Sequence, residues 1–288
     1  ELENRINGDI VIVPQANPIG LSQFPNAQLQ GRFDVSSGIN FNRDHAKIDL
    51  KDRESLLDKL ETKPATEQLK NNLLYLALGA DIIIDLHCDY ESILYAYICK
   101  EFWPDANDFA KSLDLGAVFI ADGHSSAFEE AVVHAFRHDD NKNPPRRFVS
   151  TLELRGQSDV DEKLARSDAQ KLFDFLIGRG VVAGHYQAGE KWKGTVTPLD
   201  HIEVIKTPVA GTILFNRVLN EEVKEGDLLA KIISKPGQED GIHEVFAPQD
   251  GIIVTRTFNR FAARGDQLYK MTCNGPTKTD RAPGALES

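Results

Sequence analysis

Cysteine is scarce in this sequence. Its three cysteines, Cys88, Cys99 and Cys273, are odd in number, far apart and without a CxxC spacing. A disulfide framework and a thiolate zinc site both need paired or closely spaced cysteines, so neither is predicted. This cysteine usage favours a reducing, cytoplasmic setting.

Long hydrophobic runs and an excess of basic residues are also lacking. No apolar run approaches the roughly 20 residues that a membrane-spanning helix needs, and no signal peptide opens the chain, so no membrane partner is expected. Acidic residues number 44 and basic residues 33, which gives a net charge of −11. Neutralising phosphates requires a basic face, so the balance argues against a nucleic-acid partner. It leaves room for a local basic pocket that binds a small anion.

The first part of the chain contains an alternation of strand and helix patterns. Short β-branched or apolar runs predict strands, and apolar residues at helical spacing predict helices. The predicted strands are 9–14, 81–86, 117–121 and 148–154, and the predicted helices are 66–78, 126–136 and 160–177. Residues 17–20 are predicted to form a turn or loop. This alternation is typical of an α/β domain, which we expect to span residues 1–190.

After about residue 184 the pattern changes to short β-type runs between glycine turns. Residues 207–213 match residues 247–253, and residues 225–231 match residues 264–270. Two half-repeats of this kind resemble the barrel-sandwich fold, in which two similar β-halves close around one small core. We therefore expect a β-domain over residues 191–273 and a polar tail over residues 274–288.

A histidine stands where the buried strand 81–86 ends. An imidazole at the carboxyl edge of an α/β sheet is well placed to bind a metal, which makes His87 a candidate ligand. Asp85 lies two residues earlier, on the same side of the strand, and could orient the other ring nitrogen. The alternative is a histidine that only satisfies hydrogen bonds at a strand end.

Two further elements carry chemistry. Arg43 offers a planar fork that matches a carboxylate, and Asn42 and Arg32 could add donors; a surface ion pair is the alternative for each arginine. Glu153 stands near a strand end among apolar neighbours, where desolvation would favour a general base. The alternative there is a glutamate paired with Arg155. A metal-bound histidine, a glutamate and an Asn-Arg pair are together what metal-assisted amide hydrolysis requires.

Four short motifs occur in an order that resembles a known family. They are Asn17-Pro-Ile-Gly20, Asn40-Phe-Asn42-Arg43, Asp85-Leu86-His87 and Thr151-Leu-Glu153, followed by the β-domain. With them, the sequence is similar to the succinylglutamate desuccinylase/aspartoacylase family of the zinc-carboxypeptidase superfamily. The resemblance covers the chain from about Ile10 to the second β-repeat.

The resemblance implies a role for each site residue. His87 would be the third zinc ligand, and Glu153 would be the general base and then the general acid. Asn42 and Arg43 would bind the substrate carboxylate, and Arg32 would polarise the scissile carbonyl. Arg146 or Arg147 could supply a further contact to an anion.

The sequence departs from the family pattern in two places. Asn40 replaces the usual aspartate, which alters hydrogen bonding around the site more than the chemistry. The family's first two zinc ligands come from a His-x-x-Glu element, and none of the eight histidines here has a glutamate three residues later. We expect this element before Glu1, since the chain does not begin with methionine; the alternative is a metal-free relative.

The resemblance implies a carboxypeptidase-like mixed sheet flanked by helices, followed by the β-domain. The implied function is a zinc-dependent amidohydrolase, a deacylase that cleaves the amide of a small N-acyl amino acid or related carboxylate, with one zinc ion per chain. A zinc carboxypeptidase acting on peptides and a metal-free binding protein remain as alternatives. The expected partner is a small-molecule carboxylate substrate, and assembly as a homo-oligomer is left open.

Overall fold

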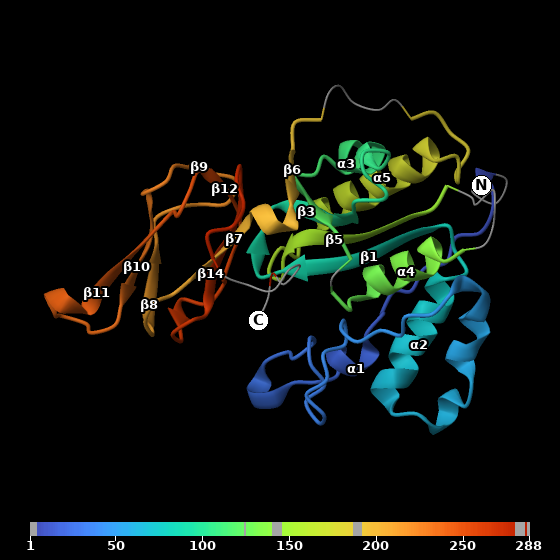
Figure 1. Cartoon of the computed structure of the whole chain (residues 1–288), viewed down its shortest axis with the longest axis horizontal. Helices are drawn as coiled ribbons and strands as arrows, with labels where there is room; N and C mark the ends of the chain where they lie inside the picture. Colours follow the sequence, from blue (N-terminus) through green and yellow to red (C-terminus); the bar gives the residue numbers. More distant parts are fainter. Residues whose placement is uncertain (1–4, 124, 140–145, 187–191, 280–285, 287–288) are drawn as a thin grey trace. The chain divides into compact units, whose positions relative to one another are not determined.

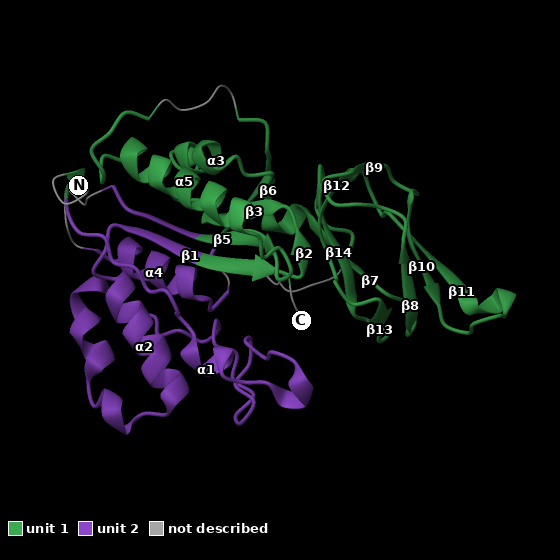
Figure 2. Ribbon diagram, turned by 180° about the vertical axis from the view of Figure 1, so that it is seen from behind, with its two compact units in different colours: residues 1–7, 86–122, 151–288 green, residues 8–85, 123–150 purple. Residues whose placement is uncertain are grey.

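The computed structural model describes residues 5–123, 125–139, 146–186, 192–279 and 286. The chain divides into two units, each assembled from segments that are far apart in the sequence (Figure 2). Unit 1 contains Glu1–Asn7, Leu86–Asp122 and Thr151–Ser288, and unit 2 contains Gly8–Asp85 and Gly123–Ser150. The predicted domain boundary at residue 190 and residues 280–285 of the predicted tail lie outside the described residues, and the sequence-based domain division stays a prediction.

Unit 2 holds two packed helices and several short ones. Its elements are α1 (Pro18–Leu21), α2 (Ala65–Ala77), α4 (Phe128–Arg137) and the 3-10 helices η2 (Pro25–Ala27), η3 (Leu50–Leu57) and η4 (Leu60–Thr62). Helix α2 starts directly after Pro64, and its apolar stripe buries Leu74 and Ala77. Helix α4 buries its alanine and valine face and packs against α2. Both helices confirm the predictions made from their apolar spacing.

The strand predicted over residues 9–14, in the segment before α1, is wrong. Residues 9–13 form no strand, and the side chains of Val11 and Ile12 are 69% and 78% exposed. β-branched side chains favour extended backbone, but a strand also needs a neighbouring strand that accepts and donates its backbone hydrogen bonds. The predicted turn at residues 17–20 is one turn of helix, capped by the Asn17 Oδ1 atom, which accepts the N–H of Gly20 at 2.8 Å.

A five-stranded sheet follows the order β1-β5-β3-β4-β6 (Figure 1). Its strands are β1 (Ile82–Asp89), β3 (Leu94–Cys99), β4 (Ala117–Ala121), β5 (Phe148–Gly156) and β6 (Thr195–Pro198). Strand β4 pairs in parallel with both β3 and β6. Helices α3 (Asn107–Leu113) and α5 (Glu162–Gly178) pack against each other in unit 1. The α/β class and the predicted strands at 81–86, 117–121 and 148–154 are confirmed.

The C-terminal part of unit 1 is built from two antiparallel sheets. Their orders are β11-β10-β8-β13 and β2-β12-β14-β7, with β9 paired to β12. The strands are β2 (Glu91–Ser92), β7 (Ile202–Lys206), β8 (Gly211–Phe215), β9 (Glu222–Val223), β10 (Leu228–Ile233), β11 (Ile242–Phe246), β12 (Gly251–Arg256), β13 (Phe261–Ala262) and β14 (Gln267–Cys273), with 3-10 turns η5 (Leu199–His201) and η6 (Glu239–Gly241). Both sheets contribute to one buried core, in which Ile213, Leu229 and Ile232 meet Ile253, Leu268 and Met271.

The internal repeat of the sequence is a structural repeat. The first half forms the antiparallel pair β8–β10, and the second half forms the antiparallel pair β12–β14. Gly226 and Gly265 occupy matched turns with φ of 85° and 90°, a backbone region that favours glycine. The N–H of Gly226 donates to Ala247 O, where the second half begins, and the N–H of Gly265 donates to Thr207 O, where the first half begins, both at 2.9 Å. Each half is thus tied to the start of the other, while the barrel-sandwich assignment stays a prediction.

Candidate active site

The predicted metal ligand and the predicted base come together on neighbouring strands. His87 lies near the end of β1, and Glu153 lies on β5, the next strand in the sheet. The Nδ1 atom of His87 is 3.9 Å from the Oε1 atom of Glu153. The Glu153 side chain is 10% exposed and the His87 side chain 30%, so the imidazole is open to solvent where the carboxylate is nearly enclosed.

Arg155 has a different partner from the one considered for Glu153. Its guanidinium makes two hydrogen bonds to the Asp168 carboxylate on α5, at 2.7 and 3.0 Å. This fork-to-fork ion pair joins the end of β5 to α5. The alternative in which Arg155 holds Glu153 as an ordinary strand-end ion pair is therefore not the arrangement found.

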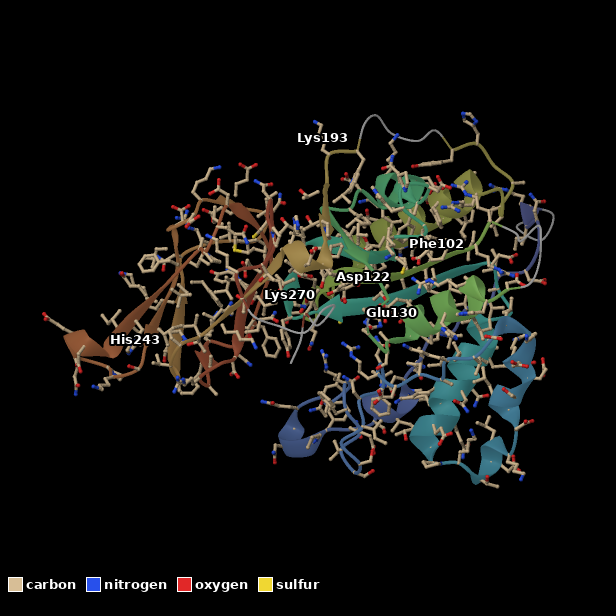
Figure 3. The ribbon with its side chains drawn as sticks, in the orientation of Figure 1. Phe102, Asp122, Glu130, Lys193, His243 and Lys270 are labelled. Carbon is tan, nitrogen blue, oxygen red and sulfur yellow. The ribbon has the colours of Figure 1, made fainter. Side chains whose placement is uncertain are left out.

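A buried polar cluster lies at the end of β1, two residues beyond His87. The Nζ atom of Lys270 on β14 is 3.0 Å from Asp89 Oδ2, and the hydroxyl of Tyr95 donates to the same oxygen at 2.8 Å (Figure 3 labels Lys270). The side chains of Lys270 and Asp89 are only 1% and 7% exposed. Burial raises the pKa of Tyr95 well above its usual value, and the nearby Tyr97, Glu153 and Asp89 raise it further. The phenol is therefore a fixed donor at neutral pH.

Cys88, between His87 and Asp89, stays a thiol. Desolvation raises its pKa, and the carboxylates of Glu153 and Asp89 add to the shift. A thiol with a raised pKa is not an activated nucleophile at neutral pH.

The predicted carboxylate-binding residues lie in unit 2. Asn42 Oδ1 accepts the backbone N–H of Phe128 at 2.8 Å, at the first residue of α4, so the amide group that can donate is Nδ2. The Arg43 guanidinium donates to Asn42 O at 2.6 Å, and Lys70 Nζ donates to Arg43 O at 2.7 Å. These bonds hold Asn42 and Arg43 together as one element. Arg32 is exposed, with its guanidinium 5.7 Å from the centre of the Phe33 ring.

Asp85 and Arg147 complete the predicted set. Asp85 is the last residue of unit 2 on β1, two residues before His87. Arg147 makes an ion pair with Asp139 at 2.5 Å, and its guanidinium lies 4.7 Å from the centre of the Phe136 ring. Its charge is thus paired next to α4, and an anion contact from Arg146 or Arg147 stays a prediction.

Two buried ionisable residues in unit 2 were not predicted. His45 is 6% exposed, and desolvation, followed by the charge of Lys70, lowers its pKa to about 4. Glu130 on α4, which Figure 3 labels, is also 6% exposed, and desolvation raises its pKa to about 7. Neither residue belongs to a motif. One sequence signal could have marked Glu130 as buried. Its position lies on the apolar face of α4, three residues after Ala127 and three before Val133.

Three metal-ligating side chains gather elsewhere in unit 2. Within the described part of the chain, one set offers three ligand atoms within 4.8 Å of one another: Asp49, His134 and His138. The spacing of the two histidines, four residues apart in a helical pattern, was a usable sequence signal, whereas nothing marked Asp49. His87 is not in this set. The described residues around His87 therefore do not by themselves form the three-ligand site that a catalytic zinc requires.

Several solved structures share the fold. A protein from Shewanella frigidimarina NCIMB 400, described as a candidate succinylglutamate desuccinylase/aspartoacylase, is 23% identical with a TM-score of 0.78, and the match covers 90% of this chain and 78% of that one. A family protein from Shewanella amazonensis SB2B is 22% identical with a TM-score of 0.78, covering 90% and 80%. The product-bound ectoine utilization protein EutE (DoeB) from Ruegeria pomeroyi is 18% identical with a TM-score of 0.70, covering 94% and 76%. Among curated proteins, none matches the chain at a significant level.

The fold is of the α/β class. Its sheet carries the imidazole of His87 and the nearly enclosed carboxylate of Glu153 on adjacent strands, and both groups are suited to acid–base chemistry. The family model for the succinylglutamate desuccinylase/aspartoacylase catalytic domain matches residues 1–178. The chain belongs to the succinylglutamate desuccinylase/aspartoacylase family. In the described residues, no helix combines the length and the apolar character needed to cross a membrane.

Proposed function

We propose that this chain is an amide hydrolase, a deacylase that acts on a small N-acyl amino acid or a related carboxylate. The observation that carries the proposal is the approach of His87 to Glu153 within the matched catalytic domain. An almost enclosed carboxylate beside a partly open imidazole supports a site in which a carboxylate handles protons away from bulk solvent.

Each residue has a proposed part in the reaction. Glu153 takes a proton from the attacking water and then returns it to the leaving amine, so that the carboxylate is restored after each cycle. Arg32 steadies the negative charge that develops on the carbonyl oxygen. Asn42 and Arg43 bind the carboxylate of the substrate, Arg43 through its two-pronged guanidinium.

Zinc binding at His87, with Asp85 orienting the imidazole, stays a prediction. Two further ligands for that ion also stay a prediction. The steps assigned to Glu153 and to the arginines do not depend on the geometry of those ligands.

Replacement of Glu153 tests the proposal. Glu153→Gln keeps the shape of the side chain and removes the proton acceptor, so kcat for N-acyl amino acid hydrolysis is expected to fall by about 10²- to 10⁴-fold. Substrate binding, measured by calorimetry, should change little. Glu239→Gln, at an exposed 3-10 turn, is the matched control and should retain full activity.

The substrate panel distinguishes the alternatives. Faster hydrolysis of dipeptides than of N-acyl amino acids would assign the chain to the peptidases. Ligand binding without turnover, unchanged by Glu153→Gln, would assign it to the binding proteins and contradict the hydrolase proposal.

A further inference from the structure

The set of metal-ligating side chains in unit 2 lies where two elements meet. Asp49 directly precedes the 3-10 helix η3, and His134 and His138 lie in the last turn of α4 and at its C-cap. Their ligand atoms are all within 4.8 Å of one another, close enough for small side-chain rotations to bring them around one ion. Asp49 and His134 are half-buried and His138 is exposed, so an ion has access from solvent.

Helix geometry places the two histidines on one face. Residues four apart on a helix are neighbours, and the two imidazole rings here have centroids 4.3 Å apart at an interplanar angle of 44°. Basic residues are also favoured at helix C-termini because of the helix dipole. That preference accounts for histidines in the last turn, but it does not account for a carboxylate from a different element beside them.

The second observation concerns the orientation of one ring. His138 Nδ1 lies 2.7 Å from the backbone carbonyl oxygen of His134. A carbonyl oxygen only accepts, so Nδ1 carries the hydrogen and the lone pair of the neutral ring is on Nε2. Metal-ligating histidines characteristically donate their other ring N–H to a carbonyl or carboxylate in this way, which fixes the tautomer and the ring direction.

The charges around the set are compatible with a cation. Asp49 supplies a negative charge. Its present partner, Lys51, lies 3.6 Å away with a side chain that is 63% exposed, an ion pair that costs little to break.

We propose that Asp49, His134 and His138 form a binding site for a divalent transition-metal ion of the zinc or nickel class. Two imidazole nitrogens and one carboxylate oxygen are ligands that such ions accept, and they leave coordination positions for water. The ion ties the start of η3 to the end of α4. The site contains none of the residues assigned to amide hydrolysis and does not rest on that function.

Metal stoichiometry tests the site directly. The protein is stripped with a chelator, dialysed against zinc or nickel, and its bound metal is counted per chain, with affinities from calorimetry. The double variant His134→Gln/His138→Gln is expected to bind one ion fewer per chain, and Asp49→Asn to bind that ion at least about tenfold more weakly. The rise in the thermal unfolding midpoint on adding metal should be lost in the double variant.

Two controls separate this site from other histidines. His185→Gln removes an exposed histidine from unit 1 and should leave the metal count unchanged. His87→Ala removes the predicted catalytic ligand and should also leave the ion at Asp49, His134 and His138 in place. Equal stoichiometry and affinity in the double variant and the unsubstituted protein would overturn the proposal, whatever the outcome for hydrolysis. So would a single ion that is lost on His87→Ala and kept in the double variant.

Discussion

At the scale of single residues, unit 2 holds two buried ionisable side chains whose pKa values are shifted for the same reason. His45 packs its ring against Phe128, with centroids 5.4 Å apart, and Glu130 is enclosed on α4. Desolvation penalises the charged form of each. Because one is a base and the other an acid, the same cause lowers the pKa of His45 and raises that of Glu130.

These two shifts predict opposite pH dependences of stability. The pKa of His45 is about 4 in the folded protein, against 6.5 for a solvent-exposed histidine, so stability falls as pH drops from 6.5 towards 4. The pKa of Glu130 is about 7, against 4.5 for a solvent-exposed glutamate, so the folded state holds an extra proton and stability falls as pH rises from 4.5 to 7. The two slopes overlap and partly cancel in the unsubstituted protein.

Glu130→Gln should make the pH dependence of stability that is due to His45 visible. Glutamine mimics the protonated acid, so the variant's free energy of unfolding should rise between pH 4.5 and 6.5 more steeply than that of the unsubstituted protein, by up to about 1.4 kcal/mol per pH unit. Urea unfolding at pH 5 and at pH 7 measures this. Glu61→Gln, at an exposed position, is the control. Parallel pH profiles for the Glu130 variant and the unsubstituted protein would contradict the assignment.

At the scale of elements, the internal repeat places two lysines at equivalent positions with opposite environments. Lys231 on β10 pairs with Glu244 at 3.0 Å, and its side chain is 39% exposed. Lys270 on β14 is 1% exposed and binds Asp89 at the end of β1. The second half-repeat therefore contacts the strand that carries His87, and its Arg256 and Arg260 pair with Glu91 on the short strand β2.

Loss of Lys270 should destabilise the protein strongly. Lys270→Met leaves the Asp89 carboxylate buried without its cation, which typically costs about 3 to 5 kcal/mol. The double variant Lys270→Met/Asp89→Asn should recover most of this loss, because both charges are then removed. Lys231→Met, the repeat-equivalent control, should cost about 1 kcal/mol or less. Urea unfolding of the four proteins gives the comparison. An equal loss of unfolding free energy for Lys270→Met and Lys231→Met would contradict the prediction that the buried ion pair matters more than the exposed one.

At the scale of the whole molecule, two strands connect the units covalently. The chain passes from unit 2 to unit 1 within β1, between Asp85 and Leu86, and again within β5, between Ser150 and Thr151. These strands are also neighbours in one sheet. Each of these two strands therefore has residues in both units.

We expect both units to unfold in one transition. Trp103 and Trp192 both lie in unit 1, with ring centroids 6.0 Å apart, so tryptophan fluorescence reports on that unit. Far-UV circular dichroism also reports on α2 and α4 of unit 2. Coincident urea transitions by the two probes are the expected result. An early dichroism change without a fluorescence change would show that unit 2 unfolds separately.

The sequence by itself determined the features that depend on neighbouring residues along the chain. Apolar spacing determined α2, α4 and α5, and short apolar runs ended by polar residues determined β1, β4 and β5. The matched glycine turns predicted an internal repeat, and the structure contains it. The four motifs identified the family and named His87 and Glu153 before their strands could be placed side by side.

The tertiary structure decided what depends on partners far away in the sequence. Residues 10–13 have strand-forming side chains but form no strand, because pairing needs a second strand that the local pattern does not specify. The environments of Lys231 and Lys270 differ although their sequence contexts match, since only one faces Asp89. Arg155 binds Asp168, and Asp49 joins His134 and His138, because helix packing brings these elements together. Local periodicity sets each element, whereas burial and side-chain pairing arise only when the elements pack.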